Sequence, residues 1–240
     1  MAGKNSDNPA QDTHPDDNIR DLRDRLTKET LAHVPFDGWG KQALLMGADD
    51  IGVAHDEALR VFPDLPKDMI SWHSMMADRA MVAEMQKLDL ATMRVTEKVR
   101  RAIILRLTQN ADDREAIKKG LAFLAMPGNS ILASRLLYRT VDDIWFVAGD
   151  TATDWNFYSK RALLAGVYSS TVLFWLADHS EGFKDTFAFM DRRLADVMKI
   201  PKVTGKLGSA MCFLPRRVKA MRSFRAGARA GSAGGSRFAR

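Results

Sequence analysis

The sequence contains a single cysteine, Cys212, among its 240 residues. One cysteine excludes an intramolecular disulfide and fits a reducing compartment. The protein is therefore not a small secreted domain held together by disulfide bonds. Its hydrophobic content of 46% is ample for an ordinary core, in one large domain or two small ones.

The sequence also lacks an apolar run long enough to predict a membrane-spanning helix. The longest uncharged apolar run, residues 162–177, has 16 residues and includes Ser169, Ser170 and Thr171, whereas a span needs about 20 residues. Residues 1–18 have neither the apolar centre of a secretory signal nor the arginine-rich, acid-poor composition of a transit peptide. We expect these residues to form a disordered N-terminus.

Sequence patterns of catalysis are missing as well. None of the five histidines lies in a His-Glu-x-x-His or Glu-x-x-His pair, and neither a glycine-rich phosphate loop nor a Gly-x-Ser-x-Gly turn occurs. Four aspartates could hold a hard cation, which leaves a metal-dependent enzyme as an alternative, but no loop of calcium-binding spacing surrounds them. The aspartates are Asp142, Asp143, Asp150 and Asp154. We therefore predict no catalytic residue, no metal site and no cofactor.

Acidic residues are absent from the C-terminal end of the chain. Residues 216–240 hold eight of the 36 basic residues and no acid, so the rest of the chain has 28 basic and 30 acidic residues. The net charge of +6 therefore belongs to this tail. A cationic tail is attracted to phosphates, either of nucleic acid or of lipid headgroups.

Alternation of polar and apolar residues is absent too, and apolar residues recur instead at helical spacing. This pattern predicts an all-α protein. The expected helices cover residues 19–33, 40–50, 54–62, 66–92, 95–109, 112–125, 129–148, 154–177 and 183–198. The first is expected to end before Pro35, because proline disfavours helix in the residue before it.

The expected helices divide the chain into five parts. Residues 1–18 are the N-terminus, 19–62 a three-helix region, 63–200 a larger helical bundle, 206–225 an amphipathic helix and 226–240 a disordered basic tail. Two short helices around Ile51-Gly52 have the outline of a helix-turn-helix. However, residues 36–62 carry five acids and two bases, and carboxylates repel DNA phosphates. We expect this region to be structural, with no nucleic acid as partner.

The helix expected at residues 154–177 is apolar on all sides. A helix of this kind is usually surrounded by other elements. One interpretation is a core helix, and the other is a helix that serves partly as core, partly as a ligand wall and partly as a subunit contact. The sequence does not decide between the two.

The basic tail carries an amphipathic pattern. Its apolar stripe consists of Leu207, Met211, Leu214, Val218 and Met221, and the cations beside it are Arg216, Arg217, Lys219 and Arg222. Such a helix can lie on an anionic membrane surface, although Pro215 would kink it or begin a second helix. A solvated tail without a fixed partner and a nucleic-acid contact are the alternatives.

Four segments together resemble a known family. They are HVPFDGW (33–39), the glycine-containing segment 38–52, VDDIW-x₂-AGD-x₂-TD-x-N-x-Y (141–158) and RALL-x₂-VY-x-ST (161–171). Across residues 31–197 the chain resembles the ubiquinone-biosynthesis accessory proteins of the coenzyme Q biosynthesis protein nine family. The block at 141–158 is long and ordered, and it carries most of this resemblance.

The resemblance implies a TetR-regulator-like helical bundle with a vestigial helix-turn-helix, a C-terminal amphipathic helix and homodimers. It implies a non-enzymatic protein that binds isoprenoid quinone intermediates or phospholipid. It further implies that the protein assists the di-iron demethoxyubiquinone hydroxylase at the membrane surface. For this chain we expect a cytoplasmic protein, peripheral on the inner face of a bacterial inner membrane. A TetR-type ligand-responsive transcriptional regulator is the alternative function.

The resemblance also implies a hydroxylase contact. Its matching positions are Asp142, Ile144, Asp154, Phe157, Tyr158 and Arg161. At two of them the residue differs from the methionine and tryptophan of relatives, because this chain has Ile144 and Phe157. For a lipid pocket no motif carries over, and helix position alone suggests Leu136, Val167, Ser170, Phe174 and Trp175.

Overall fold

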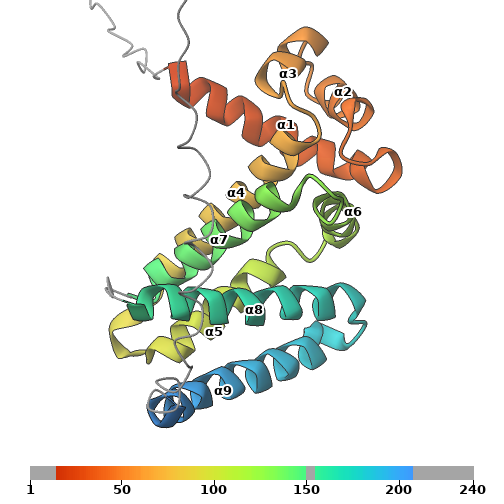
Figure 1. Cartoon of the computed structure of the whole chain (residues 1–240). Helices are drawn as coiled ribbons and strands as arrows, with labels where there is room; N and C mark the ends of the chain where they lie inside the picture. The colour runs from red at the N-terminus through yellow and green to blue at the C-terminus, as the bar shows by residue number, and fades with distance from the viewer. Residues whose placement is uncertain (1–14, 150–154, 208–240) are drawn as a thin grey trace, which may run out of the picture. The chain divides into compact units, whose positions relative to one another are not determined.

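The regular structure of the described residues is helical throughout, as the sequence predicts. The computed structural model (Figure 1) describes residues 15–149 and 155–207, with the side chains of residues 17–149 and 158–197. The α-helices are α1 (Pro15–Asp37), α2 (Lys41–Asp50), α3 (His55–Val61), α4 (Lys67–Gln86), α5 (Val95–Thr108), α6 (Arg114–Leu124), α7 (Ser130–Val147), α8 (Trp155–Ala177) and α9 (Lys184–Leu207). Two short 3₁₀ helices are η1 (Leu90–Thr92) and η2 (Glu181–Phe183).

Four helix boundaries differ from the sequence expectation. Helix α1 begins at Pro15, so the expected disorder of residues 1–18 is wrong for residues 15–18. Helix α1 continues past Pro35 to Asp37, because Val34 is fully buried in the core and tertiary packing outweighs the local preference before proline. Helix α4 ends at Gln86, several residues before Thr92, and the Asp89 side chain then accepts a hydrogen bond from the Ala91 amide within η1. Helix α9 runs on to Leu207 instead of ending near residue 198.

Helices α1, α2 and α3 form a small front region with a core of its own. The buried residues of this front core include Leu26, Leu44 and Phe62, together with Met69 from α4. Gly47 lets α2 approach α1 closely, because a Cβ atom there would lie 2.6 Å from Thr30 Oγ1 and 2.7 Å from the Thr30 amide nitrogen. The turn after α2 places Gly52 at φ +66°, a conformation that glycine adopts easily.

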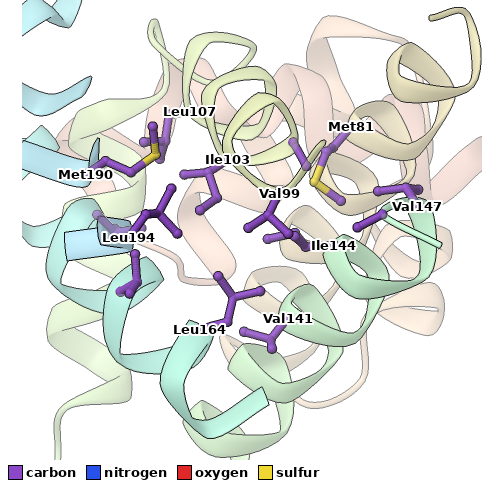
Figure 2. Packing of buried hydrophobic residues seen from close by; sticks show 14 of the residues in the cluster. Met81, Val99, Ile103, Leu107, Val141, Ile144, Val147, Leu164, Met190 and Leu194 are labelled. Atoms are coloured by element: carbon purple, nitrogen blue, oxygen red, sulfur yellow. The ribbon is translucent and has the colours of Figure 1, made fainter. Parts of the chain in front are cut away.

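A second core lies between α4, α5, α7, α8 and the first half of α9 (Figure 2). Ile103 of α5, Ile144 of α7 and Met190 of α9 are fully buried in it. Helix α4 contributes to both cores, with Met69 at its start and Met81 and Met85 near its end. The larger bundle therefore begins within α4.

Helix α8 is not covered on all sides in this chain. Its buried face carries Leu164, Val167 and Trp175, but Leu173 and Phe174 are exposed. Gly166 has open space where a Cβ atom would lie. Within the described residues α8 therefore has a buried face and an exposed face, and its role as a subunit contact stays a prediction.

Candidate functional site

A cavity of about 390 Å³ lies among α4, α5, α6, α7 and α8. Its wall consists of Trp39, Ile70, His73, Ser74, Arg106, Leu107, Asn110, Ile117, Gly120, Leu121, Leu124, Ala125, Ala133, Leu136, Leu137, Thr140, Tyr168, Ser169, Val172, Leu173 and Trp175. Most of these side chains are apolar, with a minority of polar groups between them. Small-molecule sites typically combine an apolar wall with a few polar groups that orient the ligand.

Two buried ring nitrogens of the wall have no hydrogen-bond partner in the protein. They are Nε2 of His73 and Nε1 of Trp175. His73 Nε2 lies 3.8 Å from the Asp113 carboxylate, and its ring centroid lies 5.4 Å from that of Trp39. His73 is therefore not the fully satisfied core histidine that its position in a long helix suggests. Among the described residues, these two wall nitrogens thus remain available to bond to a ligand.

In contrast to these two nitrogens, a buried carboxylate behind part of the wall has its hydrogen-bond partners within the protein. Asp78 of α4 is almost completely buried. Its oxygens accept hydrogen bonds from Arg106 Nε at 2.9 Å and Thr140 Oγ1 at 2.9 Å, and Arg139 Nε lies 3.5 Å away. Because the charge of Asp78 is compensated within the protein, this network joins α4, α5 and α7 and does not require a bound cation.

Asp143 of α7 lies close to this network. Burial, together with a smaller effect of the nearby negative charge of Asp78 and against the effect of Arg139, raises the pKa of Asp143 to about 6. Burial likewise raises the pKa of the Tyr168 hydroxyl in the cavity wall. Both groups therefore favour their uncharged forms more than they would in water.

The structure places two of the five expected pocket residues in the cavity wall. Leu136 and Trp175 line it, whereas Val167 packs in the second core. Ser170 donates to the Gly166 carbonyl at 2.8 Å, and Phe174 stacks on Phe189 with ring centroids 4.7 Å apart. The expected positions of Val167, Ser170 and Phe174 in the wall are therefore wrong. Helix position alone does not fix the face of α8 that carries Tyr168, Ser169 and Val172 toward the cavity.

The expected partner contact lies where α7 and α8 cross. Asp142 is half-exposed, and its carboxylate accepts a hydrogen bond from Arg161 Nε at 2.8 Å. The terminal nitrogen Nη2 of Arg161 lies 2.6 Å from the same carboxylate. Tyr158, one turn before Arg161, is 65% exposed. Ile144 and Arg161 are buried, which corrects the expectation that both present their side chains directly to a partner.

Several predicted residues lie outside the described part of the chain. Asp154 belongs to the segment 150–154, which the structure does not describe. Phe157 lies in α8, but its side chain is not described. Leu207 is the last residue of α9, again without a described side chain, and the rest of the expected membrane helix lies outside the described residues. Those residues are Met211, Leu214, Val218, Met221, Arg216, Arg217, Lys219 and Arg222.

The helix-turn-helix outline is present in α2 and α3, and its acidic side chains are partly engaged. Asp49 lies 2.7 Å from His55 Nε2, and Asp50 lies 2.6 Å from His33 Nε2. Helix α3, in the place of a recognition helix, has seven residues and carries Asp56 and Glu57 in its first turn. Its length and charge disfavour phosphate contacts.

Among residues 15–149 and 155–207, no three histidine, cysteine or acidic side chains gather closely enough to hold a metal ion. None of the helices in these residues combines the length and apolar composition that crossing a bilayer requires.

A family model described as COQ9 matches residues 131–201, which run from α7 into α9. The chain is 32% identical over 185 residues to the ubiquinone biosynthesis protein COQ9, mitochondrial, of Rattus norvegicus. It is equally identical over 185 residues to the protein of the same name from Homo sapiens. Over these residues the chain is similar to proteins of the COQ9 family. These matches cover 75% of the chain and 59% and 58% of the two relatives, so the chain spans under two thirds of their length.

The fold of this chain is also found in a solved structure. The TetR transcriptional regulator from Nitrosomonas europaea matches with a TM-score of 0.61 and 20% sequence identity. The match covers 74% of this chain and 98% of the regulator. The prediction of a TetR-like all-α fold is confirmed, and at this identity the likeness concerns the fold alone.

The sequence did not indicate most of the polar cavity wall, including His73 of α4 and Asn110, which follows the end of α5. One local signal was available. Arg106 lies on α5 among inward residues that are otherwise apolar, and polar residues on a buried face usually serve a specific partner. The convergence of five helices on one cavity was not available from spacing.

Proposed function

We propose that this chain is a lipid-binding accessory protein of ubiquinone biosynthesis. It binds an isoprenoid quinone intermediate or a phospholipid and presents it to the di-iron demethoxyubiquinone hydroxylase at the membrane surface. The observation that carries the proposal is the largely apolar cavity within a chain similar to COQ9-family proteins. An isoprenoid chain costs about 0.8 kcal/mol per methylene in water, so an enzyme that acts on such a lipid benefits from a carrier.

The polar groups of the cavity support a ligand with an oxygen-bearing ring. The unpartnered nitrogens of His73 and Trp175 could donate hydrogen bonds to ring oxygens, with the histidine in the tautomer protonated at Nε2. The rest of the wall would contact the apolar part of the ligand. The proposed role is binding and presentation, and the chemistry would belong to the hydroxylase.

The first test fills the cavity. Ala133→Trp adds a large side chain to the wall and is expected to reduce the isoprenoid lipid or phospholipid that co-purifies with the protein several-fold. Mass spectrometry of extracted lipids measures this. Ser134→Trp, on an exposed position of the same helix, is the matched control and should retain the lipid. Parent protein purified from bacterial membranes without either lipid class would contradict the proposal.

The hydroxylase is proposed to contact the crossing of α7 and α8. Asp142 and Tyr158 supply exposed polar and aromatic groups there. Ile144 and Arg161 would act beneath them by holding the two helices in place. Asp154 and Phe157 remain part of the proposal on the basis of the family pattern.

We further propose a homodimer through the exposed side of α8 around Ala162 and Gly166, where Gly166 leaves open space. The basic tail at residues 206–225 is proposed to hold the protein on the membrane, peripheral on the inner face of a bacterial inner membrane. The amphipathic order of its residues supports this contact.

A TetR-type transcriptional regulator is the second candidate, favoured by the shared fold alone. The excess of acids over bases in residues 36–62 opposes it. An electrophoretic mobility-shift assay at low salt separates the two functions. Tight and sequence-dependent DNA binding would favour the regulator, whereas weak and sequence-independent binding would favour the accessory protein.

A further inference from the structure

The cavity reaches the surface beside the turn between α6 and α7. Ala125 and Leu173 belong to the cavity wall and are nevertheless exposed, Leu173 to 64%. A wall residue that is also exposed marks the place where the cavity opens. Met126 follows Ala125 and is 54% exposed, and Ile131, two residues before the wall residue Ala133, is 74% exposed. The opening is therefore bordered by large apolar side chains in contact with solvent.

The chain segment on one side of this opening carries charge of one sign. Residues 116–141, which include most of α6 and α7, contain four basic residues and no acidic residue. Arg139 approaches Asp78, whereas Lys118 and Arg135 are exposed. Lys118 lies 3.7 Å from Glu115, the nearest acid before this segment. The exposed apolar residues thus lie in a cationic segment.

We propose that this opening is a second membrane contact, in which the mouth surface docks on an anionic bilayer. The mouth surface is defined as Ala125, Met126, Ile131 and Leu173 with the cations Lys118 and Arg135. Met126 and Ile131 enter the boundary of the acyl chains, and the cations meet lipid phosphates. The proposal rests on the proposed function, because it assigns the route by which the lipid reaches the cavity.

This geometry solves a transfer problem. An isoprenoid lipid that leaves the bilayer through water exposes its whole chain, and the unfavourable free energy grows with every methylene. With the mouth surface on the bilayer, the lipid passes directly from acyl chains to the apolar wall near Leu124 and Ala133. The opening has an apolar border and lies in a cationic segment. This combination fits an anionic lipid surface better than it fits an apolar groove of another protein.

The test places an environment-sensitive fluorophore on the mouth surface of the full chain. Met126→Cys is labelled with a nitrobenzoxadiazole probe in a Cys212→Ser background, and Val95→Cys is labelled as the control. Val95 is a similarly exposed apolar residue at the start of α5. Vesicles of equal parts phosphatidylcholine and phosphatidylglycerol should shift the emission at position 126 to the blue and leave position 95 unchanged. Pure phosphatidylcholine should give a smaller shift.

A second arm measures function. The double variant Met126→Asp/Ile131→Asp should take up a fluorescent lipid from anionic vesicles on the order of ten times more slowly than the parent. Val95→Asp should match the parent, and all three proteins should keep the same melting temperature. A protein that floats with the vesicles but shows no response at position 126 would overturn the proposal. This holds equally if the tail or a second copy of the chain covers the mouth surface.

The two proposals fail in different ways. Lipid that co-purifies with a protein whose position 126 does not respond would leave the lipid-binding function intact and refute the mouth surface. A response at position 126 in a protein that carries no lipid would support the mouth surface and refute the carrier.

Discussion

Asp78 shows how a single buried carboxylate can fix the arrangement of three helices. It belongs to α4 and is bonded to Arg106 of α5 and Thr140 of α7. Removing one partner of such a buried pair leaves an uncompensated charge, which is usually far more destabilising than replacing both partners together. Because Arg106 and Thr140 also line the cavity, this network fixes part of the wall without leaving a free charge toward a lipid.

Asp143 provides a pH-dependent test at the residue scale. Its pKa is raised to about 6, so the folded protein binds the proton more tightly than the unfolded chain does. Its stabilising contribution is complete below about pH 4 and is lost as the pH rises through about 6. Asp143→Asn should therefore be more stable than the parent at about pH 8, by about 1 kcal/mol after allowance for its partial exposure.

Urea unfolding at both pH values measures this difference. Near pH 4 the parent carries a protonated Asp143, so the two proteins should then have nearly the same stability. A variant that is less stable than the parent at high pH would show that attraction to Arg139 outweighs burial and the repulsion from Asp78.

Gly47 provides a second prediction at the residue scale. Replacing it with alanine should change the stability in the direction opposite to that expected from helix propensity. Alanine is normally favoured over glycine within a helix by about 1 kcal/mol. Here the new Cβ atom would lie within 2.9 Å of the Thr30 Cα and closer still to its amide nitrogen. Gly47→Ala should therefore destabilise the protein by about 2 kcal/mol, because α1 and α2 must move apart. Chemical denaturation measures this, and unchanged or increased stability would contradict the close packing.

At the scale of elements, the crossing of α7 and α8 separates support from contact. Arg161 is buried and pairs with Asp142, whereas Tyr158 points largely to solvent. Arg161→Ala should cost about 1 to 2 kcal/mol of stability through the lost charged hydrogen bonds. Tyr158→Ala should change stability by less than about 0.5 kcal/mol.

Binding to purified hydroxylase distinguishes the two roles. Tyr158→Ala should weaken it about tenfold if this aromatic residue is an interface anchor. Phe146→Ala, an exposed aromatic residue on α7 outside the expected contact pattern, is the matched control. Equal binding of the Tyr158 variant and the parent would remove this residue from the proposed contact.

At the scale of the whole molecule, the outer face of α8 is the best candidate for a subunit contact. The exposed positions of α8 include Ala162 and Gly166. Gly166→Glu should leave the fold of one chain intact, because no atom of the chain lies within 4 Å of the new Cβ. In a homodimer through this face, the buried charge should shift the protein to monomers. Light scattering measures the mass, and an unchanged dimer would place the interface elsewhere.

The sequence predicted the helices better than it predicted the cavity. Periodicity and turn residues located α2, α3, α5, α7 and α8 within about two residues, since these signals are local. The end of α1 was missed because the burial of Val34 depends on packing against distant residues. The wall residues His73 and Tyr168 were missed for the same reason, because their meeting depends on how α4 and α8 are placed around the other helices.

Helix α4 has a consequence for folding cooperativity. Its first half packs in the core of the front region, and its second half packs in the core of the bundle. Unwinding either half would expose apolar residues. It would also interrupt the backbone hydrogen bonds that run continuously through both halves of α4. The front region, with its short helices, thus depends on the bundle for its order. The backbone amides of α4 should accordingly be among the slowest to exchange with solvent, because they open only when both regions unfold together.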